Sequence, residues 1–383
     1  MKQNPVRESK LYDIDGNDAE FDHEWTSTAE DAESSWNVQL FRSINEDSAL
    51  FDRALAKKKL KIRKGRVFDD SIQQAYIHQI RRAKRFIYIE NQYFLGSCFA
   101  WSVPETTKCP HLIPAELVAR IVRAIEKGED FRVYVCVPLQ PEGDPTSAAV
   151  QEVLRWQSRT MEFMYKRIGK AIDAKGIDAQ PEDYLSFFCL TKRDALGDVP
   201  TEGLSDPPNN SIAAKCRASL RFMIYVHSKF AIFDDEYVIV GSANINERSM
   251  SGNRDTELAM GAYQPAFTKE NAEGTEICGE VRTFRLALWA EHCGKHMEEH
   301  LSPSSKECMD AMRALGADNL DRYISDKVER NDSHLTRYPL EIKISRLTSH
   351  YHVEEMEGCK KFPDLGGSVE GENSLSLPNS ITT

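Results

Sequence analysis

Two side chains capable of acid–base and electrostatic chemistry, His227 and Lys229, interrupt an otherwise apolar stretch of the chain. Residues 222 to 233 are rich in β-branched and aromatic residues, which predicts a buried strand. Side chains alternate between the two faces of a strand, so residues two apart point the same way. An imidazole and an ammonium are therefore expected side by side. Asp234 is an odd number of residues from both and is expected to face away, serving the turn or a neighbouring backbone.

Hydrogen-bonding groups follow a second expected strand at residues 237 to 240. Gly241 allows a close backbone approach, and Ser242 and Asn244 offer a hydroxyl and an amide. A phosphodiester needs its non-bridging oxygens neutralised, which Lys and neutral donors achieve. It also needs a group that attacks phosphorus or protonates a leaving alkoxide near neutral pH, as imidazole does. The pattern predicts phosphodiester chemistry; taken alone, His-x-Lys also fits a satisfied buried His beside a surface Lys.

Composition limits the class of protein. The chain has 383 residues, of which 41% are hydrophobic, enough for one large domain or two to three average ones. No apolar run approaches the length of a membrane span, and the N-terminus lacks the apolar core of a signal peptide. Nine cysteines without a C-x-x-C pair indicate reduced thiols. A net charge of −11 argues against nucleic-acid binding, and we expect a cytoplasmic protein with only peripheral membrane contact.

Periodicity predicts alternating helices and strands, which is typical of an α/β fold. The expected helices are residues 72–84, 114–127, 147–174 and 279–291, and the expected strands before the key stretch are 86–96, 131–137 and 184–190. A polar loop is expected at 191–218. The division we expect is an acidic N-terminal segment at 1–66, which contains a strand at 36–43, a catalytic-type unit at 67–345 and a polar, peripheral C-terminal tail at 346–383.

A basic strip occupies residues 53 to 66, with eight Lys or Arg and no acidic residue. Such a run is either a solvated surface or a contact for an anionic membrane. The lipid-binding reading assigns the contact to the central basic residues, which are Lys57, Lys58, Lys59, Lys61, Arg63 and Lys64.

Two other patterns suggest metal binding, but less strongly than His227 and Lys229 suggest phosphodiester chemistry. Asp13, Asp15, Asn17 and Glu24 have calcium-loop spacing, but the glycine stands at 16 rather than 18, which favours a solvated loop.

The second pattern is histidine-rich. His292, His296 and His300 fall four apart, and His296-x-x-Glu299-His300 matches an inverted zinc-peptidase motif. Gly294 weakens any helix that would align them, so a zinc peptidase is the third choice for function.

The full pattern is His227-x-Lys229-x4-Asp234-x6-Gly241-Ser242-x-Asn244, and it resembles the signature of the phospholipase D superfamily. Segments from residue 36 to 338, among them WNVQLFRS, IENQYFLGS and VYVCVPLQPEG, resemble the C-terminal half of plant-type phospholipase D. The resemblance implies mixed β-sheet flanked by helices. It also implies hydrolysis of phosphatidylcholine and related glycerophospholipids to phosphatidic acid and the head-group alcohol through a phosphohistidine, with calcium dependence open.

The resemblance also implies residue roles. His227, Lys229 and Asp234 form the catalytic motif, although strand parity gives Asp234 a structural role. His227 is expected to be the general acid. Substrate or phosphate binding falls to Lys229 and three other residues, Ser242, Asn244 and Glu257, the last of which is also a candidate for orienting an imidazole.

The family carries two such motifs that meet in one active site. Of the ten histidines here, only His227 is followed two residues later by Lys. The second motif must therefore come from a homodimer partner or from a separate N-terminal half. The alternative is a truncated, non-catalytic fragment that binds anionic lipid or protein.

Overall fold

The computed structural model describes residues 33–45, 48, 68–101, 108–198, 205–268, 279–345, 350–356 and 358–373. The calcium-loop spacing at residues 13 to 24 lies outside the described residues. So does the basic strip, and with it the lipid-binding prediction for Lys57, Lys58, Lys59, Lys61, Arg63 and Lys64.

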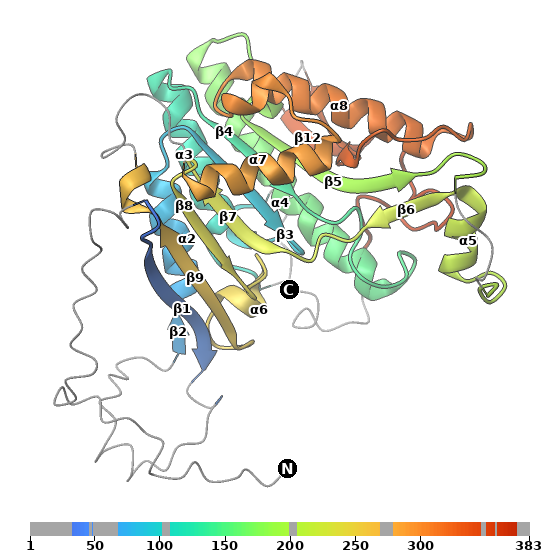
Figure 1. The fold of residues 1–383 in the computed structure, drawn as a ribbon, viewed down its shortest axis with the longest axis horizontal. Helices are drawn as coiled ribbons and strands as arrows, with labels where there is room; N and C mark the ends of the chain where they lie inside the picture. The colour runs from blue at the N-terminus through green and yellow to red at the C-terminus, as the bar shows by residue number, and fades with distance from the viewer. Residues whose placement is uncertain are drawn as a thin grey trace, which may run out of the picture.

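A mixed sheet of ten strands organises the described part of the chain (Figure 1). Its order is β10-β5-β4-β3-β7-β8-β9-β1-β2, with β6 paired to β5. The strands are β1 (Asn37–Asn45), β2 (Phe68–Asp70), β3 (Phe86–Asn91), β4 (Arg132–Cys136), β5 (Leu185–Arg193), β6 (Arg221–Ile224), β7 (Lys229–Phe233), β8 (Tyr237–Gly241), β9 (Glu257–Tyr263) and β10 (Leu335–Arg337). A separate hairpin joins β11 (Leu340–Ser345) to β12 (His350–Glu355). The expected α/β class is confirmed.

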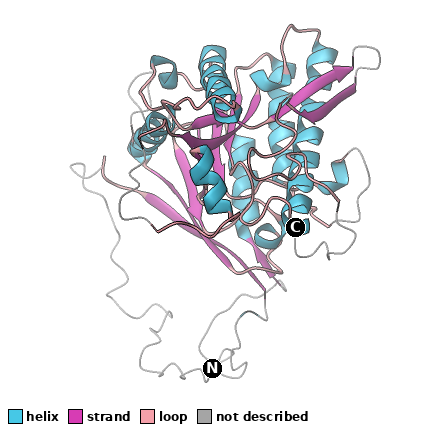
Figure 2. Cartoon of the chain, turned by 90° about the vertical axis from the view of Figure 1, so that its right-hand side faces the viewer, coloured by secondary structure: helices cyan, strands magenta, loops and turns pink. Residues whose placement is uncertain are grey.

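Helices cover both faces of this sheet (Figure 2). The α-helices are α2 (Ser71–Arg82), α3 (Ile113–Lys127), α4 (Ala148–Lys175), α5 (Ile212–Ser219), α6 (Glu247–Met250), α7 (Glu280–Cys293) and α8 (Lys306–Ile324). Short 3-10 turns are η4 (Cys98–Ala100), η5 (Pro181–Asp183), η6 (Pro265–Phe267) and η7 (Glu298–Leu301).

Two hydrophobic cores result from strand alternation. Along β3, Ile87 and Ile89 join a core shared with α2, α3 and α4. Phe86 and Tyr88 point to the opposite core, under α7 and α8. Local signals place the helix ends where the sequence predicts: α3 ends at Gly128, which has a φ of 69°.

The key stretch differs from the single strand predicted for residues 222 to 233. It forms β6 and β7 with an irregular link at residues 225 to 228, because β6 pairs with β5 whereas β7 lies between β3 and β8. The region expected to be a loop at 191–218 contains the end of β5 and α5.

Helix α7 also corrects a prediction. Phe284, expected to face inward, is 41% exposed, whereas Arg285 is fully buried. The Arg285 guanidinium forms an ion pair with Asp235, at 2.6 Å between Nε and Oδ1. A buried charge needs such a partner, and the pairing decides which face of α7 points inward.

The C-terminal segment is not the peripheral tail that its polarity suggested. Cys359, Phe362 and Val369 are buried. Gly371 lies so close to α4 that a Cβ would stand 2.2 Å from the Arg155 backbone nitrogen. Residues 358–373 therefore belong to the packed structure.

Candidate functional site

Most of the residues singled out from the sequence lie together at the ends of four central strands, along one end of the sheet. Because β3, β7, β8 and β9 alternate in direction, the ends of β3 and β8 meet the beginnings of β7 and β9. That end carries Lys229 at the start of β7, Glu257 at the start of β9, and Ser242 directly after β8. His227 is two residues before β7 and is exposed to solvent.

Gln92 links the two sides of the His227 loop. Its Nε2 donates to the hydroxyl of Tyr225 at 2.9 Å, and its Oε1 accepts from Lys229 Nζ at 2.7 Å. The rings of Tyr225 and His227 lie 6.1 Å apart between centroids, inclined by 31°. The ammonium and the imidazole thus share one neighbourhood at the sheet edge.

The Lys229 ammonium is held in place and partly desolvated. Its Nζ also donates to the backbone carbonyl of His227 at 2.7 Å. Burial lowers the pKa of Lys229, while the charge of Glu257 acts in the opposite direction. A positive charge fixed beside an exposed imidazole can bind the non-bridging oxygens of a phosphate ester.

Beneath the loop, Glu90 anchors the residue between His227 and Lys229. Its Oε2 accepts from Ser228 Oγ at 2.7 Å, and its Oε1 lies 2.7 Å from His292 Nε2. Burial raises the pKa of this carboxyl, but the His292 contact and further hydrogen bonds outweigh it, so the pKa of Glu90 is lowered. The carboxylate therefore stays ionised and connects the loop to α7.

Asn91 positions the segment that follows β8. Its Oδ1 accepts from the backbone N–H of Ile245 at 3.0 Å, and its Nδ2 donates to the carbonyl of Ala243 at 3.4 Å. The buried Oδ1 of Asn244, between them, has no hydrogen-bond partner in the described part of the chain. Gly241 is required before this segment because a Cβ would stand 2.4 Å from the carbonyl of Leu258.

Glu257 accepts two hydroxyl hydrogen bonds. Ser242 donates to Oε2, and Ser249 donates to Oε1 at 2.7 Å. Both carboxylate oxygens are thus engaged by serines. Among the described contacts, Glu257 makes no hydrogen bond to His227, and its role in orienting an imidazole stays a prediction.

Asp234 is remote from this cluster, at the other end of β7. Its carboxylate accepts from the backbone N–H groups of Lys84, Arg85 and Phe86 at 2.7, 2.8 and 2.9 Å. The residue has a φ of 57°, which asparagine and aspartate tolerate better than most residues. The structure places Asp234 at the junction of α2 and β3, away from His227.

The zinc-peptidase reading is wrong for the described chain. Helix α7 ends before Gly294, so His292, His296 and His300 do not share one helix face. His292 is bound to Glu90, and His300 is buried with both ring nitrogens unpartnered in the described structure. Among the described residues, no group of three or more His, Cys, Asp or Glu could hold a metal ion.

Sequence reasoning missed the residues that support the site. Glu90, Asn91 and Gln92 each contact the His227 or Ser242 loops, and Tyr225 packs beside the imidazole. The available signal was a run of three polar residues at the end of a strand that is otherwise apolar. Polar side chains at a strand end commonly serve a site rather than the core.

An imidazole and an ammonium at one edge of a mixed α/β sheet, with hydroxyl and amide groups beside them, define a protein suited to phosphate esters. Residues 2–371 match the family model described as phospholipase D. The chain belongs to the phospholipase D family, and the resemblance stated from the sequence is confirmed.

Full-length relatives show how much of such a protein this chain represents. It is 45% identical over 364 residues to phospholipase D delta of Arabidopsis thaliana, covering 94% of this chain and 40% of that protein. It is 47% identical over 364 residues to phospholipase D alpha 1 of Nicotiana tabacum, covering 92% and 44%. The chain therefore spans less than half the length of these relatives.

A solved structure, phosphatidylserine synthase of Haemophilus influenzae Rd KW20, overlaps more weakly. It is 14% identical, covers 76% of this chain and 48% of its own, and gives a TM-score of 0.32. An overlap this slight adds nothing to the assignment.

Proposed function

We propose that this chain forms one half of a phospholipase D active site and hydrolyses phosphatidylcholine and related glycerophospholipids to phosphatidic acid and the head-group alcohol. The observation that supports it is the exposed His227 imidazole beside the Lys229 ammonium, which Gln92 holds through a 2.7 Å hydrogen bond. Lys229 and the amide of Asn244 bind the non-bridging phosphate oxygens. Ser242 orders the Glu257 carboxylate that sustains the charge of Lys229.

The reaction uses two imidazoles in two steps. A second histidine attacks phosphorus, and His227 donates its proton to the leaving head-group oxygen, which leaves a phosphatidyl-histidine and a neutral His227. His227 then takes a proton from water, whose oxygen attacks phosphorus and releases phosphatidic acid from the second histidine.

The second histidine comes from a second copy of the chain, docked on an apolar face beside the site. This apolar face comprises Val38, Leu40, Val240, Leu258 and Phe284, with exposed fractions of 53%, 66%, 39%, 57% and 41%. Leu40, Met260 and Val240 are register neighbours across β1, β9 and β8.

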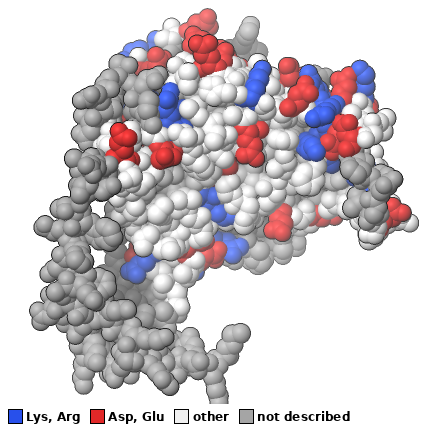
Figure 3. All heavy atoms as spheres, in the orientation of Figure 1, with Lys and Arg blue, Asp and Glu red and all other residues white. Residues whose placement is uncertain are grey.

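The apolar face lies where α7 stops covering the sheet. Phe284 of α7 packs on Phe230 at 5.4 Å between ring centroids. In Figure 1, α2 lies behind β9 and β1, and no described helix crosses these strands on the side that faces the viewer. Viewed from the same side, charged residues are sparse over this region (Figure 3). The Leu258 carbonyl accepts from the Ser242 N–H at 3.0 Å, so the apolar face begins at the strand ends that carry the site, with the Leu258 side chain on the opposite face of β9 from Glu257.

Contact with the lipid is proposed to be peripheral and cytoplasmic, with residues Lys57, Lys58, Lys59, Lys61, Arg63 and Lys64 meeting an anionic surface. Each basic residue near such a surface adds about 1 kcal/mol. Within the described part of the chain, no helix has the length and apolar character needed to cross a bilayer.

Choline release from phosphatidylcholine vesicles tests the proposal. The purified chain is compared with His227→Ala and with His78→Ala, a control at an exposed position on α2. The molar mass of each sample is measured by light scattering after size exclusion. We expect release from a dimer, its loss in His227→Ala and its retention in the control.

Mixing wild type with His227→Ala distinguishes one active site shared by both copies of a dimer from two independent active sites. With equal amounts of wild type and His227→Ala, exchanged to equilibrium, about a quarter of the activity remains if both copies must supply His227, and about half if each copy acts alone. If a folded wild-type dimer releases no choline, with or without a separately expressed N-terminal half from a relative, the enzymatic proposal is wrong and the non-catalytic fragment replaces it. Release only after addition of a separately expressed N-terminal half from a relative would replace the second copy by that half.

A further inference from the structure

A polar cavity lies at the ends of β7, β8 and β9 that are farthest from His227. Its volume is about 530 Å³, and it opens where β7 ends, β8 begins and β9 ends. The lining residues are Gln79, Arg82, Ala83, Lys84, Arg85, Phe233, Asp234, Glu236, Tyr237, Tyr263, Pro265 and Thr268. Since a strand advances about 3.3 Å per residue, the five residues of β7 place this cavity on the order of 13 Å or more from Lys229.

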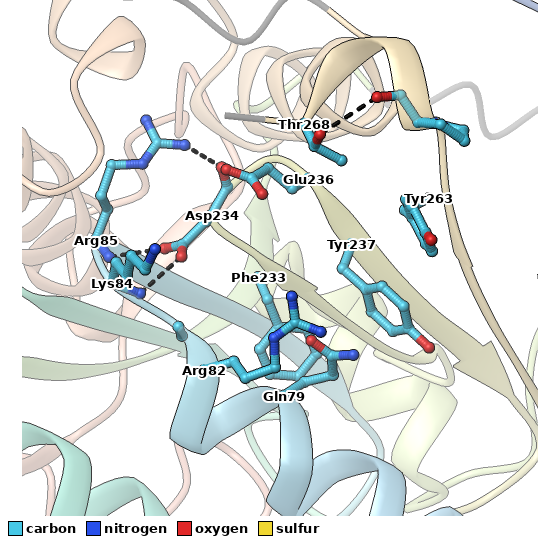
Figure 4. A pocket seen from close by; sticks show the side chains of 12 residues that line it. Gln79, Arg82, Lys84, Arg85, Phe233, Asp234, Glu236, Tyr237, Tyr263 and Thr268 are labelled. Atoms are coloured by element: carbon cyan, nitrogen blue, oxygen red, sulfur yellow. Dashed lines mark hydrogen bonds between the residues drawn. The ribbon is translucent and has the colours of Figure 1, made fainter. Parts of the chain in front are cut away.

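Three cations converge on this cavity. Figure 4 shows Lys84 and Arg85 along one side, Arg82 and Gln79 below them, and the Tyr237 ring facing them. The Tyr237 and Tyr263 rings stack at 6.0 Å between centroids, inclined by 27°, and form an aromatic wall.

The cations of this cavity outnumber its carboxylates. Among the described residues, neither Arg82 nor Lys84 forms an ion pair. Arg85 donates to the backbone carbonyl of Asp234, and its buried Nε has no hydrogen-bond partner in the described structure. Two carboxylates also line the cavity: Glu236, and Asp234, whose oxygens accept from three backbone N–H groups. The three cations therefore exceed the anions of the lining by one formal charge.

Helix termination does not explain this cluster. Basic residues in a last helical turn complement the helix dipole, which accounts for Arg82 at the end of α2. Lys84 and Arg85 follow the helix and gain nothing from that effect.

The geometry points to a binding site for a phosphomonoester group in this cavity, distinct from the phosphodiester site at His227. A phosphomonoester is a compact dianion whose several oxygens accept hydrogen bonds from more than one direction. Arg82 and Arg85 supply guanidinium donors, Lys84 supplies a point charge, and the tyrosine wall packs against the group that carries the phosphate. The same chemistry occurs in a lipid head group such as that of phosphatidic acid and in a soluble phosphate ester.

Calorimetric titration with glycerol 3-phosphate tests the site without any need for catalysis. The double variant Arg82→Ala/Lys84→Ala removes two exposed cations, so the fold should tolerate it. The matched control, Arg167→Ala/Lys170→Ala, removes one Arg and one Lys from exposed positions on α4. We expect at least about a tenfold loss of affinity in the double variant and no loss in the control.

Glu236→Gln provides a test in the opposite direction, which misfolding cannot imitate. Removing the opposing carboxylate should tighten glycerol 3-phosphate binding several-fold. Equal affinities for wild type, Arg82→Ala/Lys84→Ala and Glu236→Gln would overturn the assignment, as would an equal loss in the α4 control.

Vesicles identify the source of the phosphate. Sedimentation with phosphatidylcholine vesicles, with and without phosphatidic acid, is carried out in the His227→Ala background so that the lipid is not hydrolysed. Because residues 53 to 66 can also attract anionic vesicles, the readout is the difference between Arg82→Ala/Lys84→Ala and its α4 control. A difference confined to glycerol 3-phosphate supports a soluble ligand, and a difference with vesicles supports a head group. No difference with either probe overturns the site.

Discussion

Ser228 donates a 2.7 Å hydrogen bond to Glu90, and this contact fixes the residue that lies between His227 and Lys229. The other oxygen of the same carboxylate, Oε1, lies 2.7 Å from the Nε2 of His292 on α7. The loop that presents the imidazole is therefore tied to the sheet on one side and, through one buried carboxylate, to a helix on the other. An irregular link of four residues gains a defined conformation without contributing to the β ladder.

Ser228→Ala should reduce activity more than stability. Loss of one hydrogen bond to the buried Glu90 carboxylate costs about 1.5–3 kcal/mol of unfolding free energy. Loosening of the loop also misplaces the His227 proton donor, which lowers activity further. Choline release and urea unfolding are measured on the same samples.

Ser186→Ala is the matched control, because it also removes one partly buried serine hydrogen bond, to the Glu182 carbonyl, away from the site. Equal activity in Ser228→Ala and Ser186→Ala would show that the Glu90 contact does not position the loop.

Asp234→Ala should act through folding. Its carboxylate satisfies three backbone N–H groups at the start of β3, and their loss should cost about 3 kcal/mol or more. Asp234→Asn keeps one acceptor oxygen and suits the positive φ, so it should cost less. The order of melting temperatures checks this, with exposed Asp178→Ala as the control. Activity lost in Asp234→Asn at unchanged stability would instead indicate a direct role in the chemistry.

Local features of the fold were predictable because their causes are local. Gly128 ends α3, and the Ser147 side chain caps α4, as their residue types require. The break at residues 225 to 228 was not predictable, because apolar residues flank it on both sides and only distant strand pairing separates β6 from β7. Arg285 turns inward for a similar reason, since its partner Asp235 lies 50 residues away.

The residues of the candidate site show the same difference between local and distant causes. The residues of the motif lie within one continuous stretch, so their spacing alone suggested phosphate chemistry. Their supports do not: Gln92 reaches Lys229 across 137 residues, and Glu90 reaches Ser228 across 138. Such contacts depend on the register of β3 against β7, in which Asn91 faces Lys229. A single sequence contains no direct record of that register.

Leu258→Asp should dissociate the proposed dimer and abolish choline release without unfolding the chain. Leu258 is 57% exposed on the apolar face, so a carboxylate there stays solvated in the monomer but would be buried in the dimer. Leu196→Asp is the control, at a leucine that is 83% exposed elsewhere. Light scattering gives the mass, and circular dichroism gives the melting temperature. An active Leu258→Asp dimer would remove the apolar face from the interface.

The electrostatic pairing of Lys229 with Glu257 makes a prediction about pH. Burial lowers the pKa of the ammonium, and the Glu257 charge opposes that shift. Phosphate binding requires the protonated amine, so activity is lost as the pH rises through the pKa of Lys229. Glu257→Gln removes the opposing charge and lowers that pKa further. The alkaline limb of the kcat/KM profile should then move to lower pH.

Two variants isolate the cause of that shift. Glu247→Gln removes a carboxylate from neighbouring α6, where it accepts from the His111 backbone, and should leave the alkaline limb in place. Lys229→Arg replaces the titrating amine by a guanidinium that stays charged, so the limb should disappear and Glu257→Gln should no longer move it. A shift that persists in the Lys229→Arg background would mean that another group governs the limb, and that Glu257 acts only by ordering Ser242 and Ser249.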